Sequence, residues 1–293
     1  MEWCEKIKAE PRIQKLQTNA PIVLTYDNSL DHPGLLNYIQ TLQKNQWMYK
    51  VIGQGEVWKG FQNKIVGYKN YLKTLDENQL VVVTDARDVF CLRSPLFFKE
   101  AINSICSLES QILVSLEMFA EGYTKFDPNK NYSQVSDLTS YFKHHHLNPE
   151  TFYVERKFVN SGLIAGKAKN LVLFFEFACS YSDDQKALGD YMCLHPERVI
   201  ADIDALIIHT SSFAVNGCSF HKDQSKDSPT LADLLSKGRF FLHIPGLIVC
   251  KGQKCVYDLL NNWFNTFSSR ALLDVYDEIY NQREFYTGKY KNL

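Results

Sequence analysis

The chain has 293 residues, of which 45% are hydrophobic and 22% are charged, and its formal net charge is -1. At roughly 150 residues per domain, this length allows one large domain or two smaller ones. The composition is ordinary for a globular protein and excludes a largely disordered, coiled-coil or collagen-like chain. The balanced charge gives no sign of a nucleic-acid partner, which requires a basic excess or a basic patch.

Targeting signals are missing from the sequence. No stretch approaches the roughly 18 consecutive apolar residues that a membrane helix needs. The N-terminal segment MEWCEKIKAEPRIQK is charged and lacks the apolar core of a secretory signal peptide. The eight cysteines are scattered without a Cys-x-x-Cys pair, which favours free thiols in a reducing compartment over a zinc site. We therefore expect a cytoplasmic protein, or one packaged from the cytoplasm, without a membrane span.

Up to residue 182, short apolar segments typical of strands alternate with segments whose apolar residues recur at helical spacing. Strands are expected at 21–27, 47–53, 80–84, 112–117 and 158–166, and helices at 30–45, 63–75 and 170–182. Later strands are expected at 205–210 and 240–244, followed by a mostly helical tail, whereas the polar segment 121–157 is expected to be a long active-site loop or insertion. This alternation predicts an α/β fold whose central sheet is mainly parallel and flanked by helices, as in Rossmann-like folds. In such sheets, ligands bind at the carboxyl ends of the strands.

Two carboxylates follow the clearest strand, the β-branched run 80–84. Asp85 and Asp88 lie in the sequence TDARDV, directly after this buried segment. Two neighbouring carboxylates can bind a hard cation such as Mn²⁺ or Mg²⁺, which in turn holds phosphate oxygens. The alternative is that they cap the following turn and pair with a nearby basic side chain.

Three other segments place polar residues beside apolar ones. The small residues of FVNSGLIAG (158–166) allow a ligand to approach the backbone closely and offer amide donors to it. The alternative is that they form a tight turn. SDDQ (182–185) offers a carboxylate pair for a polar substrate, or the N-cap of a following helix. HIPG (243–246) offers a metal-binding His243 and a backbone opened by Gly246 for a phosphate, or a structural histidine.

The order of these motifs resembles the N-terminal glycosyltransferase domain of procollagen lysyl hydroxylases, which glucosylates galactosyl-hydroxylysine. The resemblance runs from about residue 21 to about residue 256. It rests on six segments: VIGQGEVWKG with NKIVGYKNYLKTL (51–75), TDARDV, VSLEMF (114–119), KFVNSGLIAG, SDDQ and LHIPG. Since neither a hydroxylase domain nor a signal is seen, we expect the chain to resemble the free-standing versions carried by large DNA viruses, and this resemblance implies a location in a host cytoplasm or a virion.

The resemblance implies a GT-A fold and a retaining, Mn²⁺-dependent transfer from a UDP-sugar, with Mg²⁺ as the other candidate ion. It implies an N-terminal arm at 1–19, a glycosyltransferase domain at 20–256 and a helical C-terminal extension at 257–293. The implied donor is UDP-glucose or UDP-galactose. The implied acceptor is a collagen-like protein carrying galactosyl-hydroxylysine, or another glycan.

The resemblance also assigns roles to individual residues. Asp85, Asp88 and His243 would hold the metal. The nucleotide and its phosphates would contact Asn28, Trp58, Lys64, Asp85, Gly246, Lys251 and Lys254. The transferred sugar and the acceptor would be surrounded by Lys64, Glu117, Asn160, Asp183 and Asp184.

Two other functions are compatible with the same residues. One is a nucleotide-sugar-binding module with the fold but little turnover. The other is a metal-dependent phosphohydrolase that uses the same aspartates and histidine and shows no preference for UDP.

Overall fold

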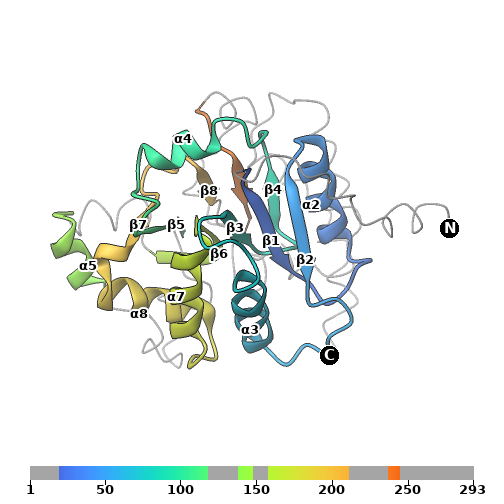
Figure 1. Cartoon of the computed structure of the whole chain (residues 1–293), viewed down its shortest axis with the longest axis horizontal. Helices are drawn as coiled ribbons and strands as arrows, with labels where there is room; N and C mark the ends of the chain where they lie inside the picture. Colours follow the sequence, from blue (N-terminus) through green and yellow to red (C-terminus); the bar gives the residue numbers. More distant parts are fainter. Residues whose placement is uncertain (1–19, 118–137, 148–157, 211–236, 245–293) are drawn as a thin grey trace, which may run out of the picture.

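The computed structural model describes residues 20–117, 138–147, 158–210 and 237–244 (Figure 1). The expected arm at 1–19 and the expected helical extension at 257–293 lie outside these residues.

A six-stranded sheet forms the centre of the protein (Figure 1). Five strands run parallel to one another, and β6 runs antiparallel to both of its neighbours, β3 and β5. The mainly parallel central sheet predicted from the sequence is therefore confirmed. The strand order is β2 (Met48–Ile52), β1 (Ile22–Tyr26), β3 (Leu80–Thr84), β6 (Phe158–Lys167), β5 (Ile112–Glu117) and β7 (Val199–Ala201).

Both faces of this sheet are covered, which explains why every residue of β3 is buried and all but Thr84 are apolar. Val81 and Val83 point into one core and Leu80 and Val82 into the other, because successive side chains of a strand alternate between faces. The first core is closed by α3 (Phe61–Leu72), α5 (Thr139–His144), α7 (Ala168–Ala178) and α8 (Asp184–Leu194). The second is closed by α2 (Pro33–Lys44), α4 (Phe98–Asn103) and a three-stranded sheet of β4 (Val89–Cys91), β9 (Phe241–His243) and β8 (Ile208–Thr210).

The chain reverses its direction of winding between β1 and β3. From β1 it passes through α2 to β2 on one side, and it then returns through α3 to β3 on the other side of β1. The carboxyl ends of β1 and β3 therefore lie side by side at a topological switch point, where open α/β sheets bind ligands. Because Leu163 pairs with Thr84, the residues that begin the antiparallel strand β6 meet the same edge.

Several elements differ from the expectations. The segments 205–210 and 240–244 contain β8 and β9, which belong to the second sheet rather than the central one. Helix α5 lies inside the segment expected to be a loop, because Leu138, Tyr141 and Phe142 recur at helical spacing and are buried against the first core. The short elements β4, β7 and α4 were not predicted, whereas α8 is the helix that the capping alternative for SDDQ allowed. A 3-10 turn (Pro196–Arg198) separates α8 from β7.

Tyr68 on α3 joins two central strands, which generates a prediction about stability. Its hydroxyl accepts a hydrogen bond from the backbone N–H of Tyr26 at 3.0 Å and donates one to the carbonyl of Thr84 at 2.7 Å. Tyr68→Phe leaves these two buried backbone groups without that partner, so we expect it to lower the free energy of unfolding by about 1–3 kcal/mol in urea denaturation. The control Tyr71→Phe alters a partly exposed side chain of the same helix and should change stability by less than about 0.5 kcal/mol. Equal effects of the two substitutions would contradict the prediction.

Candidate functional site

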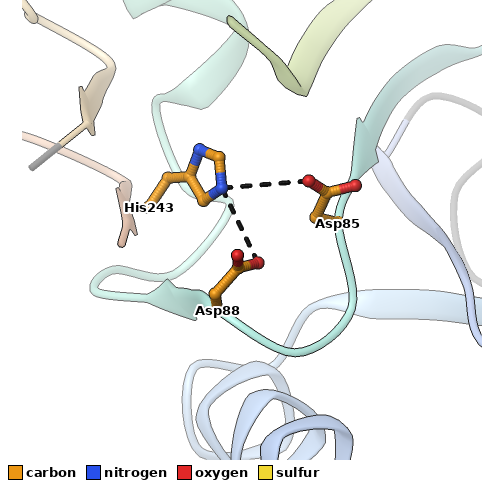
Figure 2. A group of neighbouring side chains, drawn as sticks. All are labelled: Asp85, Asp88 and His243. Atoms are coloured by element: carbon orange, nitrogen blue, oxygen red, sulfur yellow. Dashed lines mark ion pairs between the residues drawn. The ribbon is translucent and has the colours of Figure 1, made fainter. Parts of the chain in front are cut away.

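Three residues expected to bind a metal come together at the switch point. One ligand atom from each of Asp85, Asp88 and His243 lies within 4.8 Å of the other two. The Nε2 atom of His243 is 3.9 Å from Oδ2 of Asp85 and 3.6 Å from Oδ1 of Asp88 (Figure 2). Carboxylate oxygens with an imidazole nitrogen form a donor set that suits divalent ions such as Mn²⁺.

Pairing between distant segments creates this arrangement. Asp85 is the first residue after β3, and its backbone N–H donates to the carbonyl of Gly162 at 2.8 Å. Asp88 directly precedes β4, whose residue Val89 lies opposite His243 in the antiparallel pair β4–β9. The N–H of Ile244 then donates to the carbonyl of Asp88 at 2.8 Å, so backbone bonds hold both sides of the cluster.

The carboxylate of Asp88 is buried and its hydrogen bonding is incomplete. Asp88 is 3% exposed, and its Oδ1 has no hydrogen-bond partner among the residues that the structure describes. Burial raises the pKa of Asp88, and attraction to His243 offsets this effect only in part. A buried oxygen without a donor is costly, and a bound cation would relieve that cost. The described residues therefore fit a divalent metal ion.

Gly162 makes room for the cluster. A Cβ atom at this position would lie 2.7 Å from Nε2 of His243 and 2.8 Å from Oδ2 of Asp85, closer than side chains tolerate. The glycine in the Asn-Ser-Gly segment therefore serves the close approach of two side chains on other elements.

A buried lysine connects the cluster to helix α8. Lys64 on α3 is 7% exposed, and its Nζ forms ion pairs with Oδ1 of Asp85 and, at 2.7 Å, with Oδ2 of Asp184. Burial disfavours the charged ammonium, but attraction to Asp184 and Asp85 outweighs it and raises the pKa of Lys64 well above its usual value. Burial likewise opposes ionisation of Asp85, yet Lys64, and then His243, keep the pKa of Asp85 below its usual value.

The two aspartates of SDDQ do different things. Asp183 is the N-cap of α8, and its Oδ1 accepts a hydrogen bond from the N–H of Lys186 at 2.9 Å. The expected alternative, a cap for a following helix, is thus confirmed for Asp183. Asp184 is the first residue of α8, is buried, and points its carboxylate at Lys64.

Asn160 lies within a strand, so the alternative of a tight turn is wrong. The register between β5 and β6 shifts after Val114, and the side-chain oxygen of Asn160 accepts from the N–H of Gly162 at 2.8 Å within that irregularity. The hydroxyl of Ser115 donates to the Asn160 carbonyl at 3.1 Å. Glu117 is the last residue of β5, opposite Phe158 in the register.

Two residues predicted to contact the nucleotide, Asn28 and Trp58, lie near the carboxyl end of β1 and in the loop before α3. Asn28 follows β1 and donates from Nδ2 to the carbonyl of Glu56 at 3.3 Å, which ties it to the loop before α3. Trp58 in that loop is 45% exposed, and its ring lies 5.9 Å from that of Tyr26 and 5.8 Å from that of Phe61.

One ion pair at the site was not foreseen. Arg87, inside the TDARDV motif, binds Asp27 through two bonds of 2.8 Å and 2.6 Å, and its guanidinium also contacts Oδ1 of Asn28 at 3.3 Å. Asp27 follows β1 as Asp85 follows β3, and this equivalent position in the sequence could have indicated that Asp27 lies at the site. The pair anchors the 85–88 loop to the end of β1.

Other expectations fall in part on residues outside the described ranges. Gly246, Lys251 and Lys254 lie there. Among the described residues, Cys91, Cys106 and Cys179 are free thiols. No helix in the described ranges is long and apolar enough to cross a membrane.

Comparison with solved structures found distant likenesses, among them a glycosyltransferase. A solved structure of a glycosyltransferase involved in the glycosylation of the major capsid of PBCV-1 has 9% sequence identity to this chain and a TM-score of 0.43. The match covers 78% of this chain and 93% of that one. No protein-family model and no curated protein matches the chain, so the resemblance to lysyl hydroxylase glycosyltransferase domains stays a prediction.

The space around Gly162 generates a prediction about metal binding. In Gly162→Ala the new methyl group must displace His243 or Asp85, so we expect the affinity for Mn²⁺ to fall at least about tenfold in calorimetry, because packed sites do not absorb such overlaps without movement. The control Gly166→Ala lies on the same strand, where the added Cβ meets Ile112 instead, and should leave Mn²⁺ affinity unchanged. Unchanged affinity in Gly162→Ala would contradict the crowded geometry.

Proposed function

We propose that the protein is a metal-dependent, retaining glycosyltransferase that moves glucose, or galactose, from a UDP-sugar to a hydroxyl acceptor. The observation that supports this most is the cluster of Asp85, Asp88 and His243 at the switch point of the sheet. The proposed acceptor is galactosyl-hydroxylysine on a collagen-like protein, or another glycan. The sequence motifs around the cluster favour this chemistry over other uses of the fold.

The metal would be held by Asp85, Asp88 and His243. A bound Mn²⁺ or Mg²⁺ supplies positive charge that stabilises a departing diphosphate. In the chain itself, Asp85 offers Oδ2 toward His243 while its other oxygen pairs with Lys64. Lys64 thus keeps one ligand oriented before any substrate arrives.

The nucleotide would bind on the side of Trp58 and Asn28. An indole ring that is almost half exposed offers an apolar face for a nucleobase, and Tyr26 and Phe61 support it edge-on or tilted. Asn28 lies between this loop and Arg87, so the two sides of the nucleotide site are joined by hydrogen bonds. Gly246, Lys251 and Lys254 are proposed to contact the phosphates.

The sugar and the acceptor would lie toward α8 and the start of β6. Asp184 presents a buried carboxylate beside Lys64, the kind of group that orients an acceptor hydroxyl or stabilises an oxocarbenium-like centre. We propose Asp183, Asn160 and Glu117 as neighbours of the transferred sugar.

The metal assignment predicts the behaviour of Asp85→Ala. This substitution removes a ligand, so Mn²⁺-dependent binding of UDP should become undetectable by calorimetry while the circular dichroism spectrum is retained. The control Asp76→Ala removes an exposed carboxylate just before β3, at the amino end of the strand, and should bind UDP as the wild type does. An unchanged affinity of Asp85→Ala for UDP with Mn²⁺ would show that the metal is held elsewhere.

Turnover should depend on the carboxylates at the start of α8. We expect replacement of both Asp183 and Asp184 by Asn to lower kcat at least about a hundredfold at saturating Mn²⁺ and UDP-glucose, the scale for loss of a positioned acid, base or charge. Asparagine is also a good N-cap, so α8 should persist. The control Asp190→Asn alters a partly exposed carboxylate that pairs with Lys186 on the same helix, and its kcat should stay within about twofold of the wild-type value. A kcat near wild type in the double variant would remove these residues from the chemistry.

A donor screen that measures free UDP separates the proposal from its two rivals. A glycosyltransferase should release UDP slowly from one UDP-sugar in Mn²⁺ even without an acceptor. A binding module should bind UDP without releasing it from UDP-sugars. A phosphohydrolase should instead release phosphate from simple phosphoesters without preferring UDP.

A further inference from the structure

Lys64 bridges two carboxylates of different kinds. Asp85 belongs to the metal cluster, whereas Asp184 lies on α8 and is not part of that cluster as the described residues form it. The lysine is buried, so its ammonium is held by these two ion pairs rather than by bulk water. One cation thus pairs with an oxygen of the very carboxylate that would receive a metal.

We propose that Lys64 is a positioning residue that shares the charge of Asp85 in the metal-free protein and is transferred to Asp184 when a divalent cation binds. Asp184 then controls the affinity for the metal without touching it. This inference rests on the proposed function, because it concerns the same metal centre.

Simple electrostatics gives the direction of each effect. A cation that binds Asp85 is repelled by an ammonium within a few ångströms, and the repulsion is strong where water is scarce. The second partner reduces this cost, because Lys64 can keep a full ion pair with Asp184 after its bond to Asp85 weakens. Without Asp184, Lys64 has Asp85 as its one ion-pair partner among the described residues, and the metal must compete with an undivided ion pair.

The geometry allows this exchange without large movement. Lys64 lies in the first turn of α3, Asp184 in the first turn of α8 and Asp85 at the end of β3. Asp85 uses Oδ1 for the lysine and faces His243 with Oδ2, so the metal side and the lysine side of the carboxylate are already separate. A shift of the ammonium alone changes the charge that the metal meets.

A double-mutant cycle tests the proposal with Mn²⁺ alone, measured by calorimetry in the absence of nucleotide. Lys64→Met removes the competitor and should raise Mn²⁺ affinity at least about fivefold, the lower end of typical coupling between sites. Asp184→Asn should lower the affinity by at least the same factor. In the double variant Asp184 has no lysine to receive, so the affinity should equal that of Lys64→Met within about twofold.

If Lys64 and Asp184 act independently on the metal, the double variant should have a different Mn²⁺ affinity. If each residue acted on the metal directly, the two effects would multiply and the double variant would bind Mn²⁺ about as tightly as the wild type. That result would overturn the transfer of Lys64. Lack of any gain in affinity in a folded Lys64→Met would overturn it as well.

Two controls keep the test decisive. Asp183→Asn makes the same change of charge one residue away, preserves the cap, and should leave Mn²⁺ affinity within about twofold of wild type. If circular dichroism and thermal unfolding show that Lys64→Met does not fold, the comparison of Asp184→Asn with Asp183→Asn tests the proposal instead. A loss in Asp184→Asn without one in Asp183→Asn supports the proposal, and equal losses overturn it.

Failure of the inference is distinguishable from failure of the proposed function. If the wild type binds no Mn²⁺, the metal centre and the inference fall together. If the wild type binds Mn²⁺, releases UDP from a UDP-sugar and loses the metal in Asp88→Asn, but the cycle is additive, the role of Lys64 alone is wrong.

Discussion

The surrounding structure has to compensate for the negative charge that is concentrated at one edge of the central sheet. Asp27, Asp85, Asp88 and Asp184 are brought together there although like charges repel. Three side chains reduce this cost: Arg87 pairs with Asp27, Lys64 with both Asp85 and Asp184, and His243 with Asp88. The two basic side chains come from α3 and from the loop after β3, so the charges are balanced by elements that pack on the sheet itself.

The second sheet makes the site possible because it carries the histidine. Strands β4 and β9 pair so that His243 lies opposite Val89, next to the end of β3. Their apolar side chains close one core of the protein together with α2 and α4. Packing energy on that face therefore holds an imidazole beside two carboxylates, and the glycine at position 162 leaves the space that this approach needs.

The sequence predicts the site best where the signals are local. The run 80–84 is apolar on both faces, so it had to be a central strand, and Asp85 had to lie at its carboxyl end. The direction of β6 was not predictable, because its apolar run looks the same in parallel and antiparallel pairing. The bond between Lys64 and Asp184 depends on how α3 and α8 pack, which no single segment encodes. Helix α8 was offered only as an alternative reading of SDDQ, since its mixed sequence DQKALGDYMCL gives a weak apolar stripe.

The pairing of β4 with β9 also sets the order in which the site can be assembled. Residues 89–91 leave the ribosome long before residues 241–243, so the nascent chain displays both aspartates of the TDARDV motif without their histidine for most of synthesis. A contact between segments so far apart in the sequence forms late, because closing the long loop costs entropy before the contacts between the segments stabilise it. A truncated product that ends before β9 would keep all six strands of the central sheet but would lack His243, one of the three proposed metal ligands.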